Sequence, residues 1–217
     1  MREILRAVGL AALMTGALAC DDPAKDKAKA TVSEPTTTAP AAATGAAAGS
    51  ESLAIDPAAS KIEFVGSKVT GKHDGSFPTF SGKIDLAAAK PEASKITVTI
   101  DTTSVKTDNE KLTGHLKGAD FFDTEKFSKA TFESTEIKAG GEKGATHTVT
   151  GTLDLHGVKK TISFPATVAV TADAVTAKSE FSINRKDFCI IYAGKVDDLI
   201  RDDVVIKLDI KAPRKKG

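Results

Sequence analysis

The side chains with the widest chemical repertoire in this chain are its histidines, its two cysteines and a group of aspartates near the C-terminus. The histidines are scattered without the spacing of a metal site, at His73, His115, His147 and His156. No Gly-x-Ser-x-Gly elbow, His-Glu-x-x-His pair or Cys-x-x-Cys pair occurs in the sequence. We therefore predict no metal, no cofactor and no enzymatic activity.

The aspartates near the C-terminus admit two interpretations. Asp197, Asp198, Asp202 and Asp203 flank Leu199-Ile200-Arg201. Carboxylates at this density could hold a calcium ion. A solvated charged turn before the last strand is the other interpretation, and it is the one that we favour.

The two cysteines have different surroundings. Cys189 lies in the apolar run Phe188–Ile191, where a cysteine is more often a small buried hydrophobe than a redox thiol. Cys20 follows a short basic start and an apolar run over residues 7–19, which is too short to span a bilayer but suits a signal peptide.

The end of that signal is informative. Ala17-Leu18-Ala19-Cys20 resembles the lipobox of bacterial lipoproteins, although Ala17 stands where leucine is usual. We expect residues 1–19 to be a signal peptide and Cys20 to be lipidated, so that the protein is extracytoplasmic, in the bacterial cell envelope or periplasm, and anchored to a membrane. Ordinary cleavage near Ala19, which would leave a free thiol, is the alternative.

Charge excludes one class of partner. Lysine and arginine number 30 and aspartate and glutamate 29, so no field favours nucleic acid. Loss of Arg2, Glu3 and Arg6 with the signal leaves the remaining chain formally neutral. Electrostatics therefore gives no reason for binding to an anionic lipid surface.

Composition divides the rest of the chain into two parts. Residues 20–52 are rich in Ala, Thr, Pro, Ser and Gly, and such a segment cannot bury enough apolar surface to offset its ordering entropy. We expect this lipidated stretch to be a disordered linker. The ordered domain is expected over residues 53–213.

That domain is predicted to be all-β, because short runs in it alternate apolar and polar residues. The runs cover 61–64, 80–86, 96–100, 130–137, 148–155, 158–170, 175–183 and 204–210. His156-Gly157 suits a two-residue hairpin turn, which places Leu155 opposite Val158 and Leu153 opposite Lys160. Pro165 predicts a bend or an edge.

Strands without long helices must form a sandwich or a barrel. The dry faces carry small residues, namely Gly66, Gly82, Gly151, Ala177 and Ser179. They would leave a lumen for a ligand in a barrel, or they could simply relieve strand bends and bulges; the two interpretations stay equally open.

Residues 109–132 break the alternation and are expected to cap the sheet. Leu112, His115 and Leu116 would share one face of a short helix that begins near Asp108 and is limited by Gly114 and Gly118. The aromatic rings that follow, Phe121, Phe122 and Phe127, should pack against the sheet.

The ordered motifs together resemble those of the YceI-like family, over residues 55–212. They are Ile55-Asp56-Pro57, Asn109-Glu110-Lys111, His115-Leu116, Ala119-Asp120-Phe121-Phe122-Asp123, Thr131-Phe132, Thr150-Gly151, Leu155-His156-Gly157-Val158 and Ile183-Asn184-Arg185-Lys186-Asp187-Phe188. The chain departs from the family at Cys189, where Gly is frequent, and in Ser67–Gly75.

The resemblance implies an extended eight-stranded antiparallel, lipocalin-like barrel whose apolar pore holds a long isoprenoid lipid, such as a quinone or a polyprenyl phosphate. The residues expected to line the pore are Phe64, Val98, Ile100, Phe121, Phe122, Phe132, Phe181, Phe188 and Ile190. Polar residues expected at its mouth are His115, Lys160 and Arg185. A structural histidine and an ion pair of Arg185 with Asp187 or Glu180 are the competing interpretations.

We therefore expect a carrier or sequestering protein for a polyisoprenoid lipid, held on the membrane by its lipid anchor. The alternatives are an envelope hydrolase with carboxylates at the pore mouth, and a filled-core interaction module without a cavity. A homodimer is compatible with the sequence.

Overall fold

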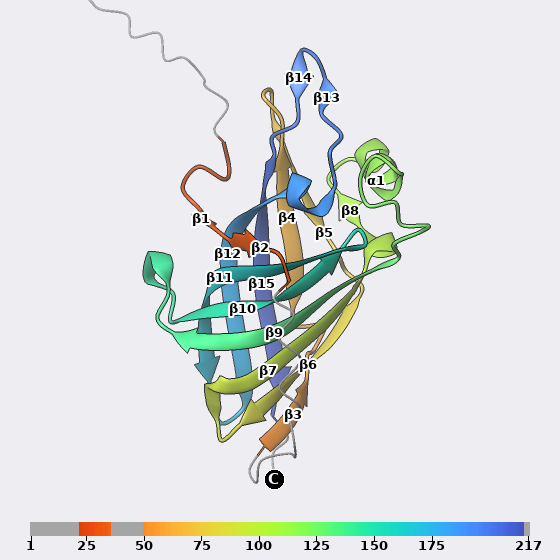
Figure 1. Cartoon of the computed structure of the whole chain (residues 1–217). Helices are drawn as coiled ribbons and strands as arrows, with labels where there is room; N and C mark the ends of the chain where they lie inside the picture. Colours follow the sequence, from red (N-terminus) through yellow and green to blue (C-terminus); the bar gives the residue numbers. More distant parts are fainter. Residues whose placement is uncertain (1–21, 36–49, 215–217) are drawn as a thin grey trace, which may run out of the picture.

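The structure is a computed structural model that describes residues 22–35 and 50–214. These residues form a 13-stranded, mostly antiparallel sheet that curls into a half-barrel (Figure 1), in the order β3-β6-β7-β9-β10-β11-β12-β15-β4-β5-β8 with β2 on β11 and β1 on β12. The all-β prediction is confirmed. The predicted count of eight strands is not, because short strands extend the sheet.

The long strands coincide with the alternating runs of the sequence. They are β4 (Lys61–Ser67), β6 (Phe80–Ala87), β7 (Lys90–Asp101), β9 (Lys129–Ala139), β10 (His147–Leu155), β11 (Val158–Val170), β12 (Ala174–Asn184) and β15 (Asp203–Pro213). The short strands of the sheet are β1 (Ala28–Lys29), β2 (Thr31–Ser33), β3 (Ser50–Ala54), β5 (Lys72–Ser76) and β8 (Lys106–Thr107). A separate hairpin consists of β13 (Gly194–Lys195) and β14 (Asp198–Leu199).

The hairpin between β10 and β11 has the predicted register. Leu155 pairs with Val158 and Leu153 with Lys160. Both turn residues are left-handed, with φ of 55° at His156 and 73° at Gly157, as a primed two-residue turn requires. A Cβ at Gly157 would lie 2.5 Å from the ring of Phe127, so glycine also makes room for the cap.

Strands β11 and β12 diverge where the sequence has proline. Their ladder covers only Thr167 to Val170 on β11. Pro165 has no amide hydrogen to donate, and its carbonyl accepts a hydrogen bond from the Ser179 hydroxyl instead. A seam therefore opens between β11 and β12, which fits the predicted bend or edge.

Residues 22–35, which we call the strap, fill this seam. In the strap, β1 pairs in parallel with Phe181 and Ser182 of β12, and β2 pairs antiparallel with Thr161 to Ser163 of β11. The prediction that the whole segment 20–52 is disordered is thus wrong for residues 22–35, and also for residues 50–52, which begin β3. Residues 20–21 and 36–49 lie outside the described residues.

The strap is ordered although it has few large side chains, because an open strand edge offers backbone hydrogen bonds to any sequence. Its small apolar groups Ala24, Ala28 and Ala30 are buried against the sheet. Its charged side chains form ion pairs with the sheet: Lys27 with Glu180, Lys29 with Asp203 and Glu34 with Lys160.

The cap contains the one α-helix among the described residues, α1 (Glu110–Lys117). The Asn109 side chain accepts a hydrogen bond from the amide of Leu112, and Gly118 ends the helix, while Gly114 lies inside it. The predicted short helix is confirmed. Three 3-10 turns complete the described elements: η1 (Thr102–Ser104), η2 (Glu142–Gly144) and η3 (Arg185–Phe188).

The half-barrel has two different ends, both visible in Figure 1. At the closed end, which carries β3 and the turn between β6 and β7, a buried cluster includes Leu53, Ile84, Leu86, Val175 and Ala212. At the mouth end lie α1, β8 and the β13–β14 hairpin. No helix of the described residues is both long enough and apolar enough to cross a bilayer.

Candidate functional site

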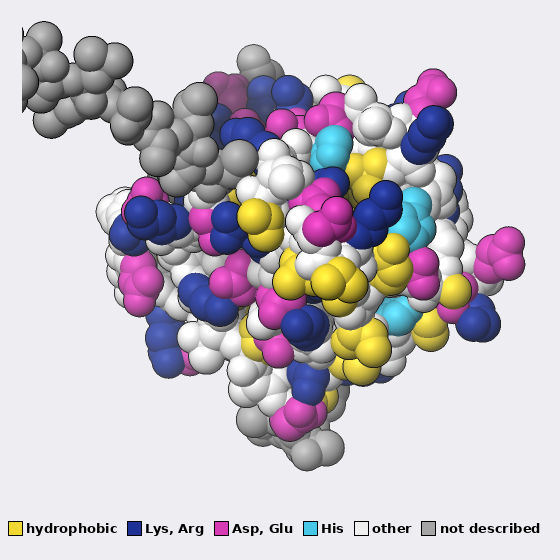
Figure 2. All heavy atoms as spheres, turned by 90° about the horizontal axis from the view of Figure 1, so that it is seen from above, with side chains coloured by type: hydrophobic (Ala, Val, Ile, Leu, Met, Phe, Trp, Pro, Cys, Tyr) yellow, Lys and Arg dark blue, Asp and Glu magenta, His cyan; other side chains and the backbone are white. Residues whose placement is uncertain are grey.

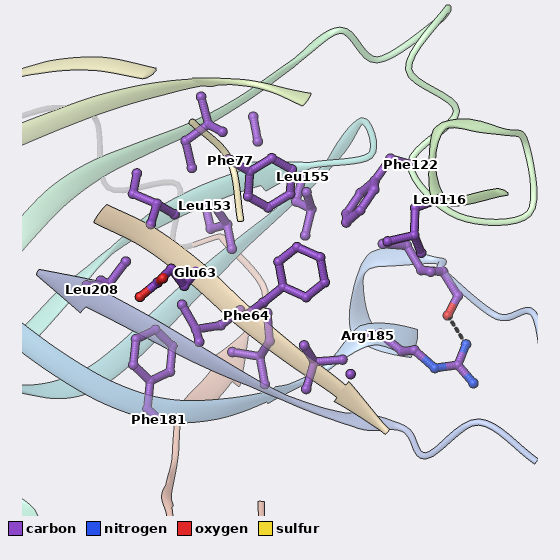
Figure 3. A pocket seen from close by; sticks show the side chains of 18 of the residues that line it. Glu63, Phe64, Phe77, Leu116, Phe122, Leu153, Leu155, Phe181, Arg185 and Leu208 are labelled. Atoms are coloured by element: carbon purple, nitrogen blue, oxygen red, sulfur yellow. Dashed lines mark hydrogen bonds between the residues drawn. The ribbon is translucent and has the colours of Figure 1, made fainter. Parts of the chain in front are cut away.

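A cavity of about 530 Å³ lies inside the curled sheet and extends from the closed end to the mouth. Its wall comes from inward-facing side chains of β4, β6, β7, β9, β10, β11, β12 and β15, and its rim from α1 and the loop that contains β13 and β14. The size falls within the range of ligand cavities, roughly 300–1,000 Å³. Hydrocarbon side chains predominate in the wall, as Figure 3 shows for Leu153, Leu155, Leu208 and Phe181.

Aromatic rings cluster in one part of the cavity wall. The ring centroids of Phe64 and Phe77 are 5.5 Å apart, and those of Phe77 and Phe122 are 5.4 Å apart. Figure 3 shows these rings turned toward one another beside Leu155. The Phe122 ring comes from the loop after α1, so the cap contributes to the cavity wall.

Eight of the nine predicted apolar residues lie in the cavity wall: Phe64, Val98, Ile100, Phe121, Phe122, Phe132, Phe181 and Ile190. Phe188 does not. It ends η3, is fully buried and packs in the cluster that contains Phe164, Phe181 and Ile183. The 3-10 turn that follows β12 takes this ring out of the inward series of the strand, which the apolar run alone could not reveal.

Other wall residues were not singled out from the sequence. The largest are Phe77, Leu112, Leu153, Leu155, Phe164, Tyr192, Ile206 and Leu208. The members on strands share the inward parity of predicted neighbours, so the alternation could have identified them. Phe77 and Tyr192 lie in connecting segments, for which the sequence offered no such signal.

Arg185 lines the cavity, yet its guanidinium forms hydrogen bonds within the protein. It donates to the carbonyl oxygens of Ile190 at 2.6 Å, Arg201 at 3.2 Å and Ile200 at 3.4 Å, and to the Asp202 carboxylate at 3.3 Å. Burial lowers the pKa of Arg185, and the Asp202 carboxylate opposes that shift. The residue thus ties down the loop at the mouth; its ion-pair partner is Asp202, not Asp187 or Glu180.

His115 stands at the rim on α1. Its Nε2 lies 2.9 Å from Asp120 Oδ2, and its ring packs against Phe121 and Tyr192 with centroids 4.9 and 5.1 Å apart. The ring therefore belongs both to the cap packing and to the cavity lining.

Lys160, by contrast, is outside the cavity wall, and its ammonium pairs with Glu34 of the strap. The prediction of a mouth position for Lys160 is wrong, since the strap had been taken for linker. Polar wall residues that the prediction missed include Lys68, His73, Asn109, Tyr192, Lys195 and Asp198.

The small residues of the dry faces divide between the two interpretations. Gly66, Ala177 and Ser179 line the cavity, and a Cβ at Gly66 would meet open space. At Gly82 a Cβ would lie 2.5 Å from the Thr97 carbonyl oxygen, and at Gly151 2.5 Å from the Phe132 ring. Gly151 also sits at a register shift between β9 and β10. The first group enlarges the lumen, and the second relieves crowding.

Two carboxylates reach the cavity, those of Glu63 and Asp198. Hydrogen bonds from Lys68 and Thr70 lower the pKa of Asp198, whereas a general acid that works near neutral pH needs a raised one. Asp198 therefore lacks the property that such an acid requires. The filled-core alternative is contradicted by the cavity itself.

Two further sequence interpretations can be compared with the structure. Asp198, Asp202 and Asp203 pair with Lys68, Arg185 and Lys29, respectively, so three of the four aspartates are held in ion pairs. Cys189 is exposed, contrary to the prediction, because it ends η3 in the left-handed region with φ of 57°. Glycine adopts that conformation most readily, which suits the Gly that the family often has there.

Comparisons with known proteins agree with this geometry. A family model described as the YceI-like domain matches residues 53–212. Among curated relatives, a UPF0312 protein of Ectopseudomonas mendocina is 45% identical over 92 residues, which cover 42% of this chain and 47% of the relative. One of Pseudomonas putida strain W619 is 45% identical over 93 residues, covering 43% and 47%. These matches span about half the length of the curated relatives.

Solved structures share the fold. Burkholderia cenocepacia BcnA superposes with a TM-score of 0.63 at 29% identity, covering 73% of this chain and 99% of BcnA. A polyisoprenoid binding domain from Saccharophagus degradans, implicated in plant cell wall breakdown, gives a TM-score of 0.59 at 22% identity, covering 75% and 98%. The Campylobacter jejuni YCEI protein gives 0.57 at 28% identity, covering 65% and 85%.

Proposed function

Because this chain belongs to the YceI-like domain family, we propose that it is a binding protein for a long isoprenoid lipid, which it carries or sequesters without chemical change. The observation that supports this proposal is the apolar cavity of about 530 Å³ inside the curled sheet. An apolar tail needs only burial to leave the membrane, and this wall offers hydrocarbon and aromatic contacts along its length. The Saccharophagus relative, a polyisoprenoid binding domain, is consistent with a ligand of this class.

The volume bears on how much of such a lipid is enclosed. If a carbon-sized group occupies about 30 Å³, as a water molecule does in the liquid, the cavity takes at least roughly 18 such groups. That corresponds to three or four five-carbon isoprene units. A longer tail would extend through the mouth, or the cavity would widen around it.

The rim offers polar partners for a head group. His115 can donate or accept a hydrogen bond, and the Lys195 ammonium, which has no ion-pair partner among the described residues, suits a phosphate. A quinone carbonyl and a polyprenyl phosphate are both compatible with this pair. We propose that the head group stays at the rim while the tail occupies the interior.

Location is part of the same proposal. Residues 1–19 have the composition of an export signal and Cys20 the context of a lipidated cysteine, although both lie outside the described residues. We propose that the exported protein is held on an envelope membrane by acyl chains on Cys20. That anchor would keep the cavity near its lipid source.

Native mass spectrometry of the protein exported by a bacterium, followed by organic extraction, tests the function. We expect a bound isoprenoid in near-stoichiometric amount, and separate incubations with a quinone and with a polyprenyl phosphate identify the head group. A mass that stays that of the empty protein after both incubations would overturn the proposal.

A matched pair of glycine variants localises the site. Gly66→Leu adds a side chain into the cavity, where a Cβ meets open space, and should abolish binding. Gly71→Leu adds the same side chain in the turn between β4 and β5, also into open space but outside the wall, and should leave binding unchanged. Equal effects of the two variants would contradict a ligand inside the cavity.

A further inference from the structure

Large apolar side chains that remain exposed are confined to one end of the described molecule. In residues 22–35 and 50–214 they are Val69, Ile191, Val196 and Leu199, with exposed fractions of 54%, 69%, 97% and 48%. We call these four side chains the mouth tips. Figure 2, which looks down on the mouth end, shows apolar side chains gathered in the middle of that face among charged ones. Scattered exposure would need no explanation, but this grouping does.

Three of the mouth tips stand on two hairpins that are joined to each other: Val69 on the turn between β4 and β5, and Val196 and Leu199 on the β13–β14 hairpin, which Ile191 precedes in the chain. The amide of Val69 donates to the carbonyl of Leu199, and Lys68 forms an isolated bridge with Ile200. The Asp198 carboxylate pairs with Lys68 and accepts a hydrogen bond from the Thr70 hydroxyl at 2.8 Å. The two hairpins therefore project as one unit, as the upper end of Figure 1 shows.

This unit is continuous with the cavity. Lys68, Gly194, Lys195, Asp198 and Ile200 belong to the cavity wall. Val69, Val196 and Leu199 directly neighbour these residues in the chain but lie outside the wall, on the solvent side. A surface that covered the mouth tips would therefore also cover the opening of the cavity.

The start of the strap points to the same end. Asp22 Oδ2 lies 3.2 Å from Arg201 Nη1, two residues after β14, and Ala24 packs with Val65 and Val205. The described chain therefore begins near Arg201, on the mouth side of the molecule, and the proposed lipidated Cys20 precedes Asp22 by two positions in the sequence.

We propose that the mouth end is a membrane-docking surface: Val69, Ile191, Val196 and Leu199 insert into a phospholipid bilayer, so that the cavity opens directly onto the membrane. The passage of a lipid through the mouth rests on the proposed function, whereas the docking of the mouth tips on a bilayer does not. A docked mouth lets an apolar tail move between bilayer and cavity without crossing water. The anchor and the tips would then hold one orientation together.

The charges of this region indicate what kind of surface it fits. The Lys68 ammonium is paired with Asp198, Arg201 with Asp22 and Lys186 with Asp202, whereas the ammonium groups of Lys72 and Lys195 have no ion-pair partner among the described residues. Docking by apolar insertion should persist at high ionic strength, in contrast to binding by a basic patch. If a label at the mouth tips stays in water when vesicles are present, a protein partner becomes the alternative occupant of this patch.

The test uses the full exported chain with Cys189→Ser and a single new cysteine, Val196→Cys, that carries an environment-sensitive fluorophore. On vesicles of phosphatidylethanolamine and phosphatidylglycerol, we expect its emission to shift to shorter wavelength and to be largely quenched by spin-labelled lipid. The matched control is Ala89→Cys in the exposed turn between β6 and β7 at the closed end, which should show neither effect. The chain without an added cysteine reports any labelling at Cys20.

Quenching at neither position, or equal quenching at both, would overturn the proposal. A second variant, Val196→Asp with Leu199→Asp, should slow the uptake of isoprenoid from vesicles several-fold and leave loading from detergent unchanged. Failure of detergent loading in the parent protein would contradict the proposed function instead. Normal loading with a tip label that stays in water would contradict the docking surface alone.

Discussion

The closed end and the mouth end of the half-barrel are held together by different interactions. At the closed end, long ladders such as β6 with β7 and β12 with β15 enclose a cluster of buried aliphatic side chains. At the mouth, the elements are short, and side-chain hydrogen bonds tie them together, above all those of Arg185 and Asp198. The contrast teaches that apolar packing stabilises the closed end, whereas a few side-chain hydrogen bonds stabilise the elements around the opening.

The largest change in the free energy of unfolding is expected at Arg185, the buried cation whose hydrogen bonds hold the mouth loop. Arg185→Met removes the donors from the carbonyl oxygens of Ile190, Ile200 and Arg201, and we expect the free energy of unfolding to fall by about 4 kcal/mol. Lys186→Met is the control, because Lys186 pairs with the same Asp202 but is exposed; it should cost less than about 1 kcal/mol. Denaturant titration measures both. Equal losses of stability in the two variants would contradict the claim that the hydrogen bonds of Arg185 stabilise the mouth.

A leucine pair compares the two ends directly. Leu86→Ala at the closed end should lower the free energy of unfolding by about 3 kcal/mol, because it opens a void in the buried cluster. Leu199→Ala at the mouth should change it by less than about 0.5 kcal/mol, since that side chain is exposed. Denaturant titration again decides. A large loss at Leu199 would show that the mouth is packed in solution.

The strap could be held by backbone pairing, as the closed end is, or by side-chain ties, as the mouth is. If backbone pairing holds it, Lys160→Met, which removes the ion pair with Glu34, should cost less than about 1 kcal/mol. Trypsin should then cut at Lys27 and Lys29 of the folded variant no faster than in the parent. Rapid cleavage would mean that the side-chain tie, and not the ladder, secures the seam.

The smallest expected effect comes from comparing two aspartates whose pKa is lowered, one at each end of the half-barrel. Lys68 and Thr70 lower the pKa of Asp198 at the mouth, and Lys83 and Ser52 lower that of Asp85 near the closed end, each from an ordinary 3.8. A depressed folded-state pKa means that each tie is intact at neutral pH and is lost as the pH falls below that ordinary value.

Amide exchange, corrected for its intrinsic pH dependence, should therefore accelerate in residues 194–199 in acid. Residues around Asp85 should keep their protection, because the β3–β6–β7 ladders remain. At neutral pH, Asp198→Asn should reproduce the acid behaviour of the hairpin, and Asp85→Asn should change little. Equal acceleration at both sites would contradict the proposed difference between the ends.

The same contrast explains what the sequence could predict. Period-2 alternation identified every long strand, and the turn at His156-Gly157 set the register from Leu155 to Val149, because burial on one face fixes both. The helix was expected to begin near Asp108 and to be limited by Gly114 and Gly118; in the structure Asn109 is its N-cap and Gly118 ends it, while Gly114 lies inside it. Most predicted wall residues followed, since parity decides which side chains face inward.

The misses fall where contacts depend on segments that are distant in sequence. The strap was mistaken for linker because strand addition requires no large side chains. The position of Lys160 was mispredicted for the same reason, because its ion-pair partner Glu34 lies in the strap. Arg185 was recognised, but its partners lie on a loop that only the fold brings close. Phe188 and Cys189 were misplaced because a 3-10 turn with a left-handed end replaces the alternation there.

The strap has a consequence for the order in which the molecule is completed. Lys27 pairs with Glu180 across 153 positions of sequence, and the strands that receive the strap are among the last to be synthesised. At roughly 5–20 residues per second, the ribosome produces the strap about 8–30 s before its partners. The earliest described segment of the sheet must therefore wait for its partner strands, and until it docks the edges of β11 and β12 are exposed to any chaperone or aggregating chain.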